Sequence, residues 1–206
     1  MRMDAVGTAA SQGHSCGLLE RAAEFALGTL EGVTAETLDM PTPCRDWNLG
    51  MLLQHTGDSL AALLEAVDTG QVRLTPEMER PPPGDDLAVV LVATFREGVE
   101  RLRRAWTTAG PDRPVTVGGS PLSADVVAGT GAVEIAVHGW DVAQALGRPR
   151  PIPPALAEQL LAIAAVVVCD VTRPGLFAPP AAVPDTAGSG ERLLAHLGRD
   201  PAAWPR

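Results

Sequence analysis

The sequence predicts an all-α protein built as a helix bundle. Apolar residues recur at helical spacing in four long segments, prolines and glycines separate these segments, and almost no part of the chain has the alternating pattern of a β-sheet. Amphipathic helices bury their apolar stripes against one another, so a four-helix bundle is the expected core. We expect residues 16–206 to form one domain and residues 1–15, which are small and polar, to form a flexible leader.

The first two helices are predicted from their apolar stripes. In the first, apolar residues recur from Leu18 to Leu30, and two prolines then interrupt the pattern. Asn48 can cap the second helix, because its side-chain oxygen can accept a hydrogen bond from a backbone N–H of the first turn. The second stripe extends to about Val67.

The next two helices follow a proline-rich linker, TPEMERPPPGDD. The third is expected from Leu87 to about Trp106. A short Val-Thr-Val segment and a Gly-Gly turn come next, and Ser123 can then cap a fourth helix that extends to Leu146. These four helices are the predicted bundle.

An additional C-terminal helix is predicted after the Pro153–Pro154 pair, followed by an extended tail. The tail is rich in proline and glycine until GERLLAHLGRDPAAW, where a brief helix is expected to pack back on the body. The longest apolar run, LLAIAAVVV at 160–168, is about half the length of a membrane span. No membrane association is therefore expected.

Charge and cysteine content narrow the classes of partner and compartment. The net charge of −9 would repel a nucleic-acid backbone, so no nucleic-acid partner is expected. Cys16, Cys44 and Cys169 form no CxxC pair and are odd in number, which favours a reducing compartment. The N-terminus has no apolar core of a signal peptide. We expect a cytoplasmic location.

One segment of the fourth helix combines apolar and ionisable residues in a way that requires a partner. In VEIAVHGWD, residues 133–141, Glu134, His138 and Asp141 fall on one narrow helix face at spacings of four and three. The other faces are apolar, so the helix is expected to be buried. Burying an unpaired carboxylate costs several kcal/mol. A divalent cation would satisfy both Glu134 and His138.

The second helix offers a third metal ligand. His55 lies about 60° from Leu52 by helical phase, at the edge of the apolar stripe, and could turn inward. Asp58 falls roughly opposite the stripe, so we exclude it as a ligand and place it in solvent. The candidate ligands are therefore His55, Glu134 and His138, and three protein ligands leave a coordination position open, as in catalytic sites. Asp141 could orient an imidazole or pair with an arginine.

Simpler interpretations compete with the metal site. Glu134 and His138 could be a hydrogen-bonded structural pair, and His55 an ordinary histidine at a helix edge. Cys44 could be a reactive thiol or a packed loop thiol. His14 and His196 have no ligand-like neighbours in the sequence, and we assign them no role.

Two motifs resemble a known family. TPCRDWNLGMLLQH at 42–55 and VEIAVHGWDVAQALG at 133–147 are similar to the DinB-like metal-binding proteins of actinobacteria related to mycothiol-dependent maleylpyruvate isomerase, and the tail from 177 to 204 is similar to that of short members. The resemblance implies a four-helix bundle with a metal held by one histidine of the second helix and a glutamate and histidine of the fourth. These correspond to His55, Glu134 and His138. We expect no counterpart of the separate C-terminal domain of the isomerase in this sequence.

The resemblance also implies a class of chemistry. The metal would activate the thiol of mycothiol, a possible cofactor, for attack on a small electrophilic substrate, so the protein would be a thiol transferase or isomerase. Zinc is the first choice of metal, and nickel, iron or copper would accept the same ligands. A hydrolase with a metal-bound water and a non-catalytic metal- or ligand-binding bundle stay open, as do a monomer and a homodimer.

Overall fold

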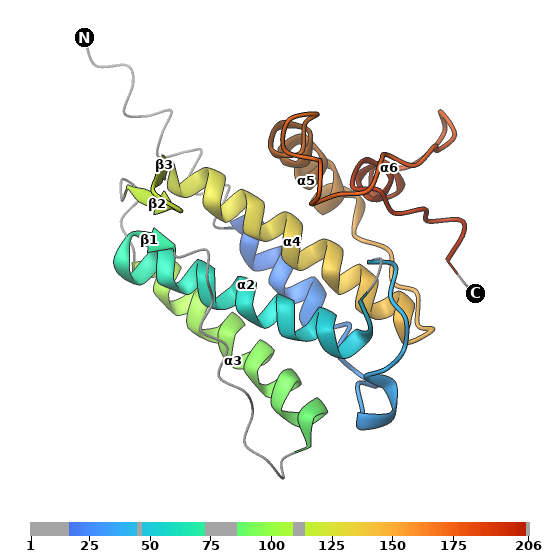
Figure 1. The fold of residues 1–206 in the computed structure, drawn as a ribbon, viewed down its shortest axis with the longest axis horizontal. Helices are drawn as coiled ribbons and strands as arrows, with labels where there is room; N and C mark the ends of the chain where they lie inside the picture. The colour runs from blue at the N-terminus through green and yellow to red at the C-terminus, as the bar shows by residue number, and fades with distance from the viewer. Residues whose placement is uncertain (1–16, 45–46, 73–85, 109–113, 205–206) are drawn as a thin grey trace.

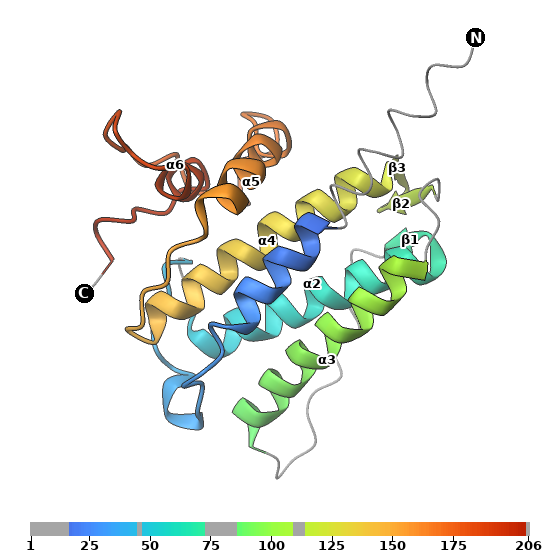
Figure 2. The same ribbon diagram turned by 180° about the vertical axis from the view of Figure 1, so that it is seen from behind.

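The structure is a computed structural model that describes residues 17–44, 47–72, 86–108 and 114–204. Its main body consists of four helices side by side, with two further helices standing together beside this body (Figures 1 and 2). The predicted all-α bundle with an additional C-terminal helix is confirmed. The leader, His14 and most of the proline-rich linker lie outside the described residues.

The N-terminal helix covers residues 17–27, and a single 3-10 turn, η1 (Ala35–Thr37), lies in the loop that follows. The second helix of the bundle, α2 (Leu49–Thr69), begins as predicted, because Asn48 accepts a hydrogen bond from the backbone N–H of Met51. Gly70 ends α2 in the left-handed conformation, with φ of 73°, which a residue without a Cβ adopts at little cost.

The third helix, α3 (Leu87–Thr108), packs on α2 and is followed by a small sheet that the sequence predicted only in part. The Val-Thr-Val segment is β2 (Val115–Val117), and it pairs antiparallel with β3 (Ser120–Leu122) across the Gly-Gly turn. The two residues of β1 (Gln71–Val72), which follow α2, pair parallel with β2. This two-residue strand is too short to give an alternating pattern in the sequence.

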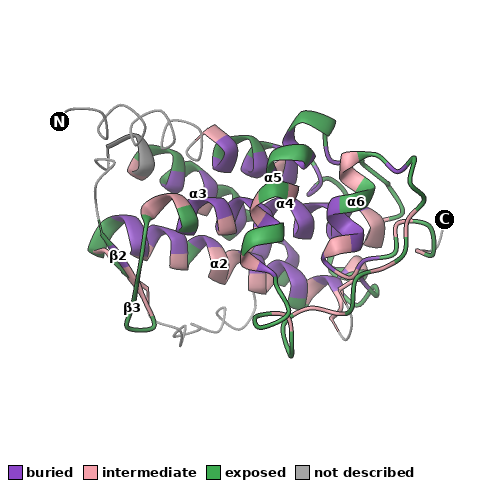
Figure 3. Ribbon diagram, turned by 90° about the horizontal axis from the view of Figure 1, so that it is seen from above, coloured by how far each residue is buried: buried purple, intermediate pink, exposed green. Residues whose placement is uncertain are grey.

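The fourth helix, α4 (Ala124–Ala145), is the most buried helix of the bundle. Ser123 caps it as predicted by accepting a hydrogen bond from the backbone N–H of Val126. Fifteen of its residues are buried, from Val127 to Ala143, as the band of buried residues along α4 shows (Figure 3). Its apolar faces therefore contact neighbours on several sides, which explains why ionisable groups on it need partners.

The C-terminal segment packs against the bundle through α4. The helix α5 (Pro154–Val167) contacts α4, and α6 (Ser189–His196) packs on α5. The prolines before and at the start of α5 fit a helix N-terminus, because the first N–H groups of a helix have no intrahelical acceptor. Among the described residues, no helix is both long and apolar enough to cross a membrane.

Gly139→Ala is expected to destabilise the fold by about 1–3 kcal/mol, as overpacking of a core does. A Cβ at Gly139 would lie 2.9 Å from Cα and Cβ of Ala26, so the N-terminal helix and α4 would have to separate. Gly57→Ala is the control: its Cβ would meet Thr94 at an ordinary 3.6 Å, and the helix propensity of alanine would stabilise α2 by up to about 1 kcal/mol. Urea unfolding measures both changes. Equal stability of the two variants would contradict the close approach of the helices.

Candidate metal centre

The structure brings the three candidate metal ligands together between α2 and α4. His138 Nε2 lies 3.0 Å from Glu134 Oε2, and His55 Nε2 lies 3.8 Å from the same oxygen. The two imidazole rings meet edge to face, with centroids 5.1 Å apart. One donor atom from each of the three residues lies within 4.8 Å of the others. Their assignment as metal ligands stays a prediction, since adjacent side chains can also form a hydrogen-bonded cluster.

The site is buried on one side and open on the other. The His138 side chain is only 6% exposed, whereas those of His55 and Glu134 are 38% and 34% exposed. This difference in exposure has a structural cause. His138 lies on α4, which is covered on several sides, whereas His55 lies at the edge of the apolar stripe of α2. A ligand could therefore approach from the side of His55 and Glu134.

Asp141 performs both roles that its spacing allowed. Its Oδ2 lies 3.0 Å from His138 Nδ1, and the same oxygen accepts a hydrogen bond from Arg199 Nη2 at 2.9 Å. Asp141 is fully buried and Arg199 is 8% exposed. When Asp141 is ionised it can only accept, so Nδ1 of His138 must carry the proton and Nε2 faces Glu134. The Arg199–Asp141 pair therefore fixes the orientation of the imidazole.

The charges within this cluster shift the pKa values of Glu134, His138 and Asp141. Burial alone would raise the pKa of Glu134, but hydrogen bonds with His138 and His55 lower it well below its usual range. Burial would lower the pKa of His138, but its hydrogen bonds with Asp141 and Glu134 raise it to about 9. Burial would also raise the pKa of Asp141, but the charge of Arg199 and the hydrogen bond with His138 lower it below its usual range. At neutral pH Glu134 and Asp141 are therefore ionised and His138 is protonated.

Trp47 and Cys44, from the loop before α2, lie beside the cluster. The ring centroid of Trp47 is 4.5 Å from that of His55 and 6.0 Å from that of His138, so the indole forms part of the wall of the site. Cys44 is partly buried, and its sulfur lies within 4.8 Å of a ring nitrogen of His138 and a carboxylate oxygen of Asp141. The thiol is thus close to the site, and the choice between a reactive and a packed thiol stays open.

The placement of Asp58 in solvent is wrong. Asp58 is partly buried on α2, and this burial raises the pKa of its carboxyl group, although the charge of His55 opposes the rise. Helical phase was a poor guide because neighbouring elements also cover the side of α2 away from its apolar stripe. Asp58 does not belong to either group of potential metal ligands found among the described residues, so its exclusion as a ligand agrees with the geometry.

Sequence reasoning missed Arg199 and Trp47. Arg199 follows α6, 58 residues after Asp141, so no local spacing connects the two. Trp47 lies in the TPCRDWN segment that carried the family resemblance, but an indole in a loop has no periodic signal. His196 lies in α6, where its Nε2 is 3.2 Å from the backbone oxygen of Ala164, away from the cluster.

Comparisons with known proteins match the whole bundle. Residues 19–143 match the model of the mycothiol maleylpyruvate isomerase N-terminal domain. Two uncharacterised proteins of Mycobacterium tuberculosis, one from each of two strains, are 26% identical over 182 residues, which is 87% of this chain and 94% of theirs.

A solved structure shares the fold. A crystal structure of a histidine-to-alanine variant of mycothiol-dependent maleylpyruvate isomerase matches with a TM-score of 0.57 and 17% identity, over 82% of this chain and 74% of the other. The structural match covers more of the chain than the family model, which spans residues 19–143. The structural likeness therefore extends into the segment after α4. The fold is DinB-like, and the chain belongs to the mycothiol maleylpyruvate isomerase N-terminal domain family.

Proposed function

We propose that this protein is a metal-dependent enzyme in which His55, Glu134 and His138 hold a divalent cation that activates a small thiol for attack on an electrophilic substrate. The donor set supports the proposal: two imidazole nitrogens and a carboxylate oxygen from two helices lie within 4.8 Å of one another, on the accessible side of a buried cluster. This convergence is the observation that carries the proposal.

The distances fit a first-row divalent cation. Ligands at about 2.0–2.1 Å from a tetrahedral zinc lie about 3.3 Å from each other. The measured separations of 3.0 and 3.8 Å from Glu134 Oε2 to the two imidazole nitrogens bracket this value. Zinc is the preferred metal for this donor set, and nickel, iron and copper are alternatives that metal analysis distinguishes.

The residues around the ligands would orient the site. Asp141, held by Arg199, keeps Nδ1 of His138 protonated and directs Nε2 toward the shared position beside Glu134. The Trp47 indole lies against His55, with ring centroids 4.5 Å apart and the planes tilted by 56°, and so covers one side of the imidazole. Since Glu134 and His55 remain about one-third exposed, a substrate could approach from their side.

The proposed chemistry is thiol addition. A cation at this site would lower the pKa of a coordinated thiol and so supply a thiolate near neutral pH. Such a thiolate would supply the nucleophile for reversible addition to an activated cis double bond, and His55, Glu134 and His138 would hold the cation that keeps the sulfur ionised. A related transfer reaction would leave the sulfur attached to the substrate. The solved relative is a mycothiol-dependent isomerase, and we propose the same class of thiol cofactor here.

Metal affinity is expected to increase with pH. In the metal-free protein the pKa of His138 is about 9, so a cation must displace the proton on Nε2 at neutral pH. Because this value lies above that of an unfolded histidine, about 6.5, protonation stabilises the metal-free fold below about pH 6.5, and this contribution is lost as the pH rises to about 9. Metal binding therefore adds more stability at the higher pH.

Calorimetry in two buffers with different ionisation enthalpies measures the proton released by zinc binding. We expect close to one proton per zinc at about pH 7.5, and fewer as the pH approaches 9. Zinc binding with no proton release, and with equal affinity across this range, would contradict a site in which His138 is a ligand.

A conjugation assay tests the function. Metal-loaded protein is mixed with an electrophilic alkene and mycothiol, and loss of the alkene or conversion of its cis form is followed by absorbance. Metal-dependent turnover with mycothiol supports the proposal. Turnover of an ester or amide without added thiol would instead indicate a hydrolase, and tight metal binding without turnover of either substrate would indicate a non-catalytic bundle. The thiol mechanism is abandoned in both of those cases.

A further inference from the structure

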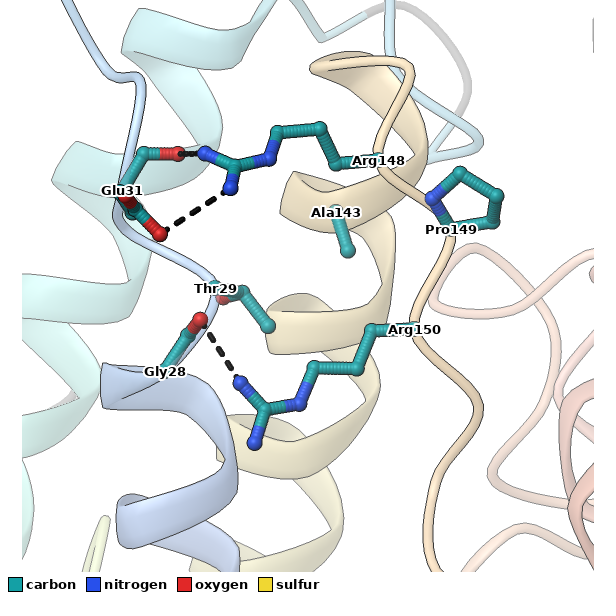
Figure 4. Close-up of a pocket in the computed structure, with 7 residues that line it drawn as sticks. All are labelled: Gly28, Thr29, Glu31, Ala143, Arg148, Pro149 and Arg150. Atoms are coloured by element: carbon teal, nitrogen blue, oxygen red, sulfur yellow. Dashed lines mark hydrogen bonds and ion pairs between the residues drawn. The ribbon is translucent and has the colours of Figure 1, made fainter.

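A cavity of about 390 Å³ lies between the end of the N-terminal helix and the connection from α4 to α5 (Figure 4). Gly28, Thr29 and Ala143 form its floor, and these small residues leave the space open. Arg148 and Arg150 reach across it from the connection. Two guanidinium groups on one cavity stand out in a protein with a net charge of −9.

Arg150 is held in a defined position. Its Nη1 donates a hydrogen bond of 2.8 Å to the backbone oxygen of Gly28, and its guanidinium carbon lies 5.5 Å from the ring centroid of Phe25. A Cβ at Gly28 would come within 2.1 Å of the same Nη1, so a larger residue at position 28 would displace the guanidinium from this position. This hydrogen bond uses one of the five N–H donors of Arg150, which leaves donors for a ligand.

Arg148 is held on the other side of the cavity. It donates to the backbone oxygen of Glu31 at 3.0 Å, and its Nη2 lies 3.1 Å from the Glu31 carboxylate. The Glu31 side chain is 81% exposed, so it could swing away and release Arg148 to another anion at little cost. Pro149, between the two arginines, restricts the backbone that carries both. The cavity therefore has a net positive charge and two oriented planar donors.

The cavity is separate from the candidate metal centre. Ala143 on its floor follows His138 by five residues of α4, a rotation of about 140° and a rise of about 7.5 Å along the helix. The metal cluster faces α2, whereas the cavity faces the end of the N-terminal helix. An occupant of the cavity would not contact His138.

We propose that this cavity is a binding site for the oxyanion group, carboxylate or phosphate, of a small molecule, held between Arg148 and Arg150. Planar guanidinium groups match both oxyanions through paired hydrogen bonds. The volume exceeds that of a bare ion and lies in the range of small-molecule sites, so a small organic acid or phosphate ester fits best. The inference does not depend on the proposed function of the metal centre.

Calorimetry at low ionic strength tests the site with two probes, succinate for a carboxylate source and inorganic phosphate for a phosphate source. Saturable binding of either probe to the parent protein, with and without metal, is expected, and the tighter probe identifies the source. Arg150→Gln should weaken binding about tenfold or more, as expected for loss of hydrogen bonds to a charged group. Gly28→Ala keeps every charge but displaces the guanidinium, and it should have a similar effect.

Two further variants separate a binding site from a structural role of the arginines. Glu31→Gln removes the competing carboxylate from Arg148 and should strengthen binding, which a role limited to holding the helix end would not produce. Arg96→Gln removes one exposed charge from α3 and should leave binding unchanged. Circular dichroism confirms folding, and Arg150→Lys replaces Arg150→Gln if the latter does not fold. Absence of saturable binding to the parent, or equal weakening by Arg96→Gln, overturns the proposal.

Discussion

His138→Ala is expected to abolish stoichiometric metal binding. His138 is the buried member of the proposed ligand set and the only one that Asp141 orients among the described contacts. Loss of an outer partner of a metal ligand already costs about 10–100-fold in affinity, so loss of the ligand itself should cost more than about 100-fold. Elemental analysis of protein purified without a metal-affinity tag should show close to one metal per parent chain and almost none in the variant.

The matched control is His196→Ala. It removes one histidine from α6, away from the cluster. If the metal were bound adventitiously by histidines in general, His196→Ala and His138→Ala would lower the metal content equally. The metal content of this variant should equal that of the parent. The thermal stability gained by adding zinc should also be kept in His196→Ala and lost in His138→Ala, because only a cation that binds the folded state stabilises it. A parent and a His138→Ala variant with equal metal content and equal zinc-dependent stability would refute the site.

Most of the fold could be predicted from local patterns. The caps Asn48 and Ser123 mark the starts of α2 and α4, since a side-chain oxygen before an apolar stripe satisfies free N–H groups whatever the helix packs against. The strand β1 could not be predicted, because its two residues pair with β2, which lies beyond α3 in the sequence. Pairing between distant segments leaves no periodic trace in the chain.

The candidate site shows the same division. Glu134, His138 and Asp141 were predictable because one helix fixes their spacing, and His55 because helical phase and the family resemblance both indicated it. The role of Arg199 could not be predicted from the sequence, because its contact with Asp141 depends on how the segment after α4 packs. Asp58 was misplaced because phase describes one helix, whereas burial depends on every element packed around it.

Arg199→Met is expected to destabilise the fold strongly. The substitution removes the guanidinium charge from an ion pair in which Asp141 is fully buried and Arg199 is 8% exposed. Methionine retains most of the apolar part of the arginine side chain. An uncompensated buried carboxylate costs about 3–5 kcal/mol, although His138 offsets part of this while it is protonated. Urea unfolding of metal-free protein measures the loss.

Two variants determine whether the loss arises from the buried charge. Asp141→Asn added to Arg199→Met removes the orphaned charge, so the double variant should be more stable than Arg199→Met alone. Arg148→Met is the exposed control: its pair with Glu31 is solvated, so the variant should lose no more than about 1 kcal/mol. If Arg199→Met and Arg148→Met were equally stable, the Asp141–Arg199 pair would not hold the C-terminal segment against α4. In that case the imidazole of His138 would owe its orientation to Asp141 alone, and the metal affinity of Arg199→Met should equal that of the parent.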